Sequence, residues 1–127
     1  MLAIPPAQPT LPPGGADRTP VRDALWEHCR NSLGIARLLV QERRPAALVA
    51  TACHTAAEAA CRAALWQARL PFDGDLDRTL ARLHAPAGLW SGAAGLEPAE
   101  QLAAAGRVVA WAAAYLRAEV PERRWGY

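Results

Sequence analysis

The chain has 127 residues, of which 52% are hydrophobic and 20% charged, and it carries a net charge of +2 with a pI near 8.7. This length is typical of one domain, and the composition excludes an intrinsically disordered chain. So small a positive charge does not by itself indicate nucleic-acid binding, although all 14 cationic residues are arginine.

The cysteine count and the hydropathy pattern bear on the compartment. The three cysteines form an odd and sparse set, which favours a reducing cytoplasm over a disulfide-linked scaffold. The longest apolar stretches are interrupted by arginine or glutamate, so none has the length of a membrane span. We therefore expect a cytoplasmic protein that has no membrane partner.

Residues 1–19 contain five prolines and two glycines. Proline fixes its backbone and lacks an N–H, so this composition excludes a helix and favours extended chain. We expect a flexible arm, and the alternative is a strap that packs on a neighbouring subunit.

The first predicted helix begins at Thr19-Pro20, because threonine is a good N-cap and proline suits the first helical position. It ends near Arg43-Arg44, before Pro45. Its apolar positions recur at helical spacing, and its charged residues fall largely away from them. The apolar stripe is Val21, Leu25, Cys29, Leu33, Ala36 and Val40, broadened by Ile35 and Leu39, and the residues away from it are Arg22, Asp23, Glu27, Arg30 and Arg37.

A second helix is predicted from about Pro45 to Arg69, and nearly all its apolar residues are small. Small residues let helix axes approach closely, so this helix is expected at the centre of a bundle. A short third helix is predicted from Asp75 to His84, ended by Pro86 and Gly88.

The fourth predicted helix runs from about Glu97-Pro98 to Val120 and carries a second apolar stripe of Val108, Trp111 and Tyr115 beside its main one. A helix with two apolar faces usually buries both, so one face is expected in the core and the other in a homodimer interface. The basic and aromatic tail, 121–127, contains Trp125, which we expect to face solvent.

These elements predict an all-α fold, an up-down four-helix bundle with a short third helix, over residues 20–120. Sustained alternation of apolar and polar residues is absent, so strands have little support. If the first two helices fold back around Arg44-Pro45, positions whose numbers sum to about 90 face each other. Cys29 and Cys61 meet that sum, and we expect buried free thiols there, with no metal and no cofactor.

A polar stripe of His54, Glu58 and Arg62 occupies four-residue steps of the second predicted helix. One interpretation is a solvated stripe whose Glu–Arg pair contributes about 0.2–0.5 kcal/mol. The other is a polar groove between protomers in which Arg62 holds a nucleotide phosphate and His54 donates or accepts a hydrogen bond.

The pattern resembles the HEPN domain, a helical module associated with nucleotide binding. Members typically end their first helix in an Ala-x-x-Leu-Leu phrase, to which Ala36-Arg37-Leu38-Leu39-Val40 is similar. Their second helix carries a glutamate followed four residues later by lysine, the spacing of Glu58 and Arg62, with Leu65 at the family's leucine. Where the family often has His-Asp-Leu, this chain has Gly74-Asp75-Leu76. The likeness covers about 21–116.

The resemblance implies two kinds of function. Many HEPN members are metal-independent ribonucleases with a late Arg-x4–6-His motif, in which histidine transfers a proton and arginine stabilises phosphate charge. Residues 88–127 contain no histidine, and the Arg-x5-His spacings fall earlier, at Arg22 with His28 and at Arg78 with His84. Arg78 and His84, at a helix end, are the better candidate catalytic pair.

The catalytic motif is missing from its usual place, so we expect a non-catalytic HEPN-like module, dimeric, that binds a nucleotide, RNA or a protein partner. The alternatives are a toxin-like ribonuclease that uses Arg78 and His84, and a purely structural helical interaction protein.

Overall fold

The computed structural model describes residues 19–90 and 96–127. The proline-rich arm, apart from Thr19, and part of the loop before the last helix therefore lie outside the described residues. Within these two ranges the chain is all-helical, without strands, and none of its helices is long and apolar enough to cross a membrane. The helices are α1 (Thr19–Gln41), α2 (Ala46–Ala68), α3 (Leu76–Arg82) and α4 (Pro98–Glu119).

Local signals account for the helix ends. Arg69 ends α2 in the left-handed conformation, with φ of 64°. The carboxylate of Asp75 caps α3 by accepting a hydrogen bond from the Arg78 backbone N–H at 3.0 Å. A capping box between Glu97 and Glu100 opens α4.

The end of α1 comes two residues before the predicted Arg43-Arg44. Arg43 adopts a left-handed backbone with φ of 53°, and the Arg44 N–H donates to the Leu39 carbonyl at 2.9 Å. A hydrogen bond from a backbone N–H to the carbonyl five residues earlier is typical of a helix C-terminus. It places Arg43 and Arg44 in the turn that leads into α2.

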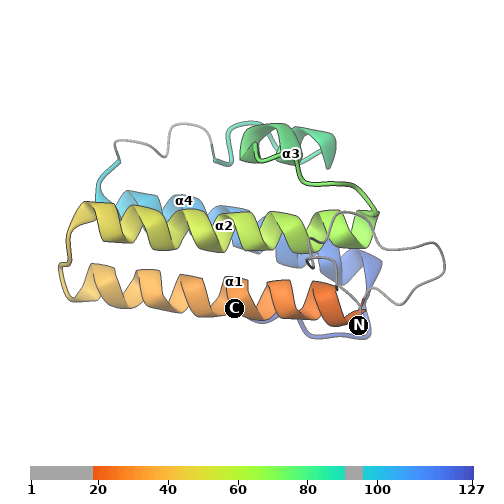
Figure 1. Cartoon of the computed structure of the whole chain (residues 1–127), viewed down its shortest axis with the longest axis horizontal. Helices are drawn as coiled ribbons and strands as arrows, with labels where there is room; N and C mark the ends of the chain where they lie inside the picture. Colours follow the sequence, from red (N-terminus) through yellow and green to blue (C-terminus); the bar gives the residue numbers. More distant parts are fainter. Residues whose placement is uncertain (1–18, 91–95) are drawn as a thin grey trace, which may run out of the picture.

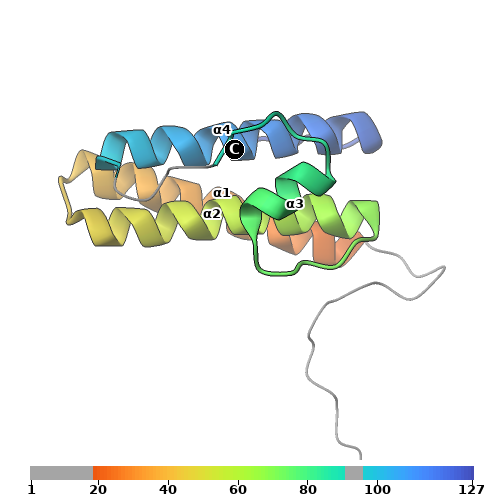
Figure 2. The same ribbon diagram turned by 90° about the horizontal axis from the view of Figure 1, so that it is seen from above.

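The helices α1 and α2 lie side by side as an antiparallel hairpin, and α4 packs behind it (Figure 1). Seen from above, α3 lies over α2 and α4, away from α1 (Figure 2). The central helix is α2, as its alanines predicted, because their short side chains allow close contact with α1 and α4. The fully buried small residues of α2 are Ala56, Ala57, Ala60, Cys61, Ala63 and Ala64.

The second apolar stripe of α4 is covered by the same chain. Val108 is fully buried in a cluster that includes Leu76 and Leu80 of α3, and Trp111 and Tyr115 are partly buried against the clusters of the same chain. Because α3 and its flanking loops pack on part of this face, it is weaker support for a dimer interface on α4, which stays a prediction.

The tail corrects the expectation that Trp125 faces solvent. After Pro121 the chain returns to the start of α1, where the Trp125 ring is 3% exposed and meets Trp26 edge-on, with ring centroids 5.7 Å apart. The indole N–H of Trp26 donates to the Gly126 carbonyl at 3.0 Å, and that of Trp125 donates to the Val120 carbonyl at 3.2 Å. Both aromatic donors are thereby satisfied in the interior.

Arg22 was expected away from the apolar stripe but is buried. Its guanidinium lies 5.1 Å from the centroid of the Trp125 ring and donates to the Gln67 side chain of α2 at 2.9 Å. Its neighbour Asp23 forms an ion pair with Arg123 of the tail at 2.7 Å. Arginine is suited to this site because its planar group stacks on a ring while it donates hydrogen bonds.

Candidate binding groove

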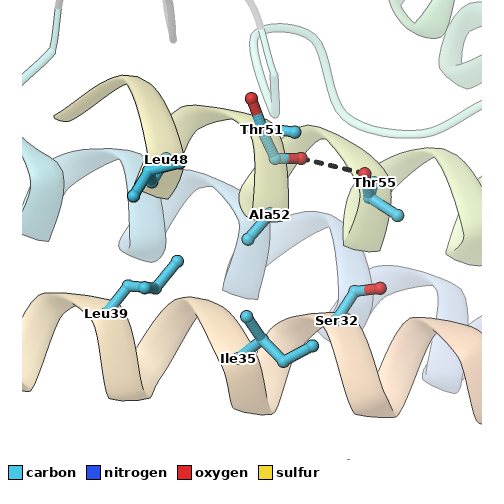
Figure 3. Close-up of a pocket in the computed structure, with 7 residues that line it drawn as sticks. All are labelled: Ser32, Ile35, Leu39, Leu48, Thr51, Ala52 and Thr55. Carbon is cyan, nitrogen blue, oxygen red and sulfur yellow. Dashed lines mark hydrogen bonds between the residues drawn. The ribbon is translucent and has the colours of Figure 1, made fainter. Parts of the chain in front are cut away.

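The outer side of the α1–α2 hairpin, away from α4, contains a groove with an apolar half. Ile35 and Leu48 are 54% and 46% exposed, and Leu38, one turn beyond Ile35 on α1, is 51% exposed. The described ranges expose four large hydrophobic side chains: these three and Tyr127. The hollow of this half has a volume of about 330 Å³ and is lined by Ser32, Ile35, Leu39, Leu48, Thr51, Ala52 and Thr55 (Figure 3).

The threonines in this half have their hydroxyls bound to their own helix. Thr51 donates to the Ala47 carbonyl at 3.0 Å, and Thr55 donates to the Thr51 carbonyl at 2.9 Å (Figure 3). These hydroxyl donors are used locally, so the chemistry of this half is that of its aliphatic side chains.

The other half of the groove is polar and smaller, with a hollow of about 150 Å³. Thr55 lines both hollows, so the two adjoin along the hairpin, and together they are called the groove. The side chains around the polar half are Leu25, His28, Thr55, Glu58, Ala59 and Arg62.

The structure brings together two of the three residues of the predicted polar stripe in this hollow. Glu58 lies between the other two, with Oε2 at 3.4 Å from Nε of Arg62 and Oε1 at 3.9 Å from Nδ1 of His54. His54 does not line the hollow, and its ring contacts that of Trp90, with the centroids 6.0 Å apart. His54 is thus separated from the hollow that Glu58 and Arg62 line.

Arg62 is held in place by its neighbours. Its guanidinium carbon lies 4.7 Å from the centroid of the Phe72 ring, on the loop between α2 and α3. Its Nε is buried without a hydrogen-bond partner, because the contact with Glu58 is an ion pair without hydrogen-bond geometry. The adjacent Glu58 carboxylate offsets most of the positive charge of Arg62, so the hollow is a poor site for a second anion.

His28 is the residue of this hollow that the sequence reasoning missed as a groove residue. It comes from α1, 34 positions before Arg62, so no local motif joins the two. The fold-back rule could have found it, because 28 and 62 sum to 90, as do 35 and 55 from the apolar half.

The predicted catalytic pair, Arg78 and His84, lies elsewhere, on α3 and just after it. The guanidinium of Arg78 contacts Asp73 at 3.2 Å and Asp75 at 3.8 Å. The backbone N–H of Asp75 donates to the Asp73 carboxylate and holds its pKa below the ordinary value. The guanidinium of Arg78 adds to this effect. His84 is exposed beyond the end of α3, with φ of 59°. A phosphate near Arg78 would meet two carboxylates, which oppose its binding.

The earlier Arg–His spacing is not a pair in the structure either. Arg22 is directed to Gln67 and the tail, whereas His28 lines the groove. No group of three or more histidine, cysteine, aspartate or glutamate side chains in residues 19–90 and 96–127 could hold a metal ion. Cys29, Cys53 and Cys61 are free and buried, as expected for Cys29 and Cys61.

Comparison of the chain with protein-family models, with curated proteins and with solved structures found no match. The HEPN resemblance therefore stays a prediction, and the argument for function depends on the groove itself.

Proposed function

We propose that the chain is a non-catalytic, HEPN-like helical module of the cytoplasm that binds a helix of another protein in the α1–α2 groove. The observation that supports this is that Ile35 and Leu48, each about half exposed, line an apolar hollow, with the exposed Leu38 on the next turn of α1. Exposed apolar patches on an otherwise polar surface mark interaction sites. A groove between two helices accepts the apolar face of a third.

The groove has enough apolar surface to bind a helix with useful affinity. Complete burial of one leucine or isoleucine side chain contributes about 1.5–3 kcal/mol. Part of that gain is already realised in the free chain, since Ile35 and Leu48 are half covered. Burial of the remaining surface of Ile35, Leu38 and Leu48 still favours association by several kcal/mol before ordering costs.

The ligands of the HEPN resemblance are less favoured by the same surface. Nucleotide or RNA binding at His54, Glu58 and Arg62 would place phosphate beside the Glu58 carboxylate, which already pairs with Arg62. The ribonuclease alternative needs Arg78 free to meet phosphate, and its guanidinium is held between Asp73 and Asp75. The homodimer was predicted through α4, and a second copy bound in the groove instead is a competing arrangement, to be distinguished by experiment.

A model helix tests the proposal. The probe is a 16-residue, fluorescein-labelled peptide with leucines along one face and only neutral glutamine and alanine elsewhere. We expect saturable binding by fluorescence anisotropy, and at least tenfold weaker binding to Ile35→Glu and Leu48→Glu, since tenfold corresponds to about 1.4 kcal/mol. Both positions are exposed, so both variants should keep the far-ultraviolet circular dichroism of the parent chain.

The matched control is Ala103→Glu, which adds the same charge at an exposed position of α4. We expect its affinity to stay within twofold of the parent chain. Equal binding by all four proteins, or an absence of saturable binding by the parent chain, would contradict a helix-binding groove.

A further inference from the structure

We propose that the helix bound in the α1–α2 groove is acidic: an amphipathic helix of a different protein that carries aspartate or glutamate along the margins of its apolar face. This inference rests on the proposed function and specifies the partner's chemistry. It follows from the charges at the apolar end of the groove and from the composition of the remaining surface.

Beyond the apolar end of the groove lies the cationic turn between α1 and α2. The turn contains Arg43 and Arg44 against a single carboxylate, Glu42, a local net charge of +1. All three side chains are exposed, and none has an ion-pair partner within the described ranges. Arg43 and Arg44 lie in the turn that joins the Leu39 end of α1 to the Leu48 end of α2. Carboxylates on a docked helix would compensate this charge.

The polar end of the groove is lined by His28, and the charge of Arg62 at this end is offset by Glu58. From Leu25 to Leu39 the groove follows α1 for about 21 Å, at 1.5 Å of rise per residue. A partner helix of about four turns therefore reaches both ends, with its apolar face against Ile35 and Leu48.

A second copy of this chain fits the groove less well. Apart from Ile35, Leu38 and Leu48, the described surface exposes no other large aliphatic side chain. Apolar contact between two copies would thus have to be isologous, with the same patch on both. That arrangement brings the Arg43-Arg44 turns of two net-positive chains toward the same interface, where like charges oppose association.

Three peptides with one leucine face and different flanking residues test the inference: glutamate, glutamine or lysine at the same positions. We expect the glutamate helix to bind the full chain at least tenfold more tightly than the lysine helix in 0.05 M salt. The difference should shrink severalfold at 0.5 M salt, since screening weakens exposed charge pairs. The double variant Arg43→Glu with Arg44→Glu should remove the preference and still bind the glutamine helix.

The matched control is Arg107→Glu with Arg117→Glu, which makes the same change of net charge on exposed positions of α4. It should keep most of the preference for the glutamate helix. Equal groove-dependent affinity for the three peptides, or the same loss of preference in both double variants, would overturn the acidic partner and leave the proposed function standing. If the glutamine helix fails to bind, the proposed function fails with it.

Two further outcomes identify other occupants. A concentration-dependent dimer in sedimentation, abolished by Ile35→Glu, would assign the groove to a second copy and overturn the proposal. Tighter peptide binding by a variant with Ile4→Ser and Leu11→Ser would assign it to the chain's own residues 1–18, and would also overturn it.

Discussion

Burial raises the pKa of all three cysteine thiols from an ordinary value of 9.0. It reaches about 12 for Cys29 and Cys61 and about 11 for Cys53, and at Cys61 the neighbouring Cys29 and Glu58 add to the effect of burial. In the unfolded chain these thiols lose their protons near pH 9, whereas in the folded chain they keep them. The unfolded state then binds fewer protons, so the free energy of unfolding falls as pH rises.

We predict that the stability of the chain declines between pH 9 and pH 11, by up to about 1.4 kcal/mol per pH unit for each thiol. The chain has no lysine, so no lysine side chain contributes to the change of stability in this pH range. Burial also raises the pKa of Tyr115, which acts in the same direction. Urea unfolding at several pH values measures the slope. A variant with Cys29, Cys53 and Cys61 replaced by alanine should have a shallower slope, and an unchanged slope would contradict this cause.

Gly34 lies within α1 on an exposed surface, and a Cβ atom added there would meet no atom within 4 Å. Glycine in a helix interior costs about 0.5–1 kcal/mol relative to alanine, since its unfolded backbone has more freedom. We predict that Gly34→Ala raises the free energy of unfolding by about this amount, measured by urea titration. Destabilisation would show that this position needs glycine for a reason outside the packing described above.

Alanine positions on α2 and α4 differ sharply in their tolerance of a larger side chain. Ala60 is fully buried between α1 and α4, whereas Ala103 on α4 is exposed. We predict that Ala60→Leu lowers the free energy of unfolding by about 1–3 kcal/mol, because extra methyl groups force packed helices apart. Ala103→Leu should change it by less than about 0.5 kcal/mol. Equal effects in thermal unfolding would mean that the helices are not closely packed at Ala60.

The sequence predicts the elements better than the groove. Caps and breakers such as Pro45, Asp75 and Pro98 are local signals, and they place the ends of three helices within about two residues. The Glu58–Arg62 pair follows from helical spacing alone. The joining of His28 to that pair depends on how α1 lies against α2, and the exposure of Ile35 depends on the side that α4 leaves open. Both are tertiary properties, so periodicity within one helix could not determine them.

The same reasoning explains the errors about the tail. A short segment with proline, arginines and tryptophan has the composition of an exposed end, and Trp125 was predicted accordingly. Its burial requires a partner 99 residues earlier, Trp26, whose ring it meets edge-on. Arg22 is buried through the same contact, since it lies over the Trp125 ring.

The tail holds the first and last helices of the molecule together, so its loss should affect the whole fold. We predict that Trp125→Ala lowers the free energy of unfolding by about 3–5 kcal/mol, through lost burial and the cavity left behind. Domains of this size are stable by about 5–15 kcal/mol, so the variant should unfold at a markedly lower temperature. Arg124→Ala, an exposed neighbour, should be within about 0.5 kcal/mol of the parent chain. Similar melting temperatures for both variants would contradict the buried tail.

The hydrogen bond from Trp26 to Gly126 joins residues 100 positions apart, and this separation has a kinetic consequence. The α1–α2 hairpin forms contacts between near neighbours along the chain, which are fast to make, whereas the tail can dock only after α4 has found its place. Contacts that form only after the folding transition state slow unfolding and leave the folding rate almost unchanged. In stopped-flow fluorescence, Trp125→Phe should therefore accelerate unfolding and leave the refolding rate nearly unchanged, so that the last few residues act as a latch that sets the lifetime of the native state.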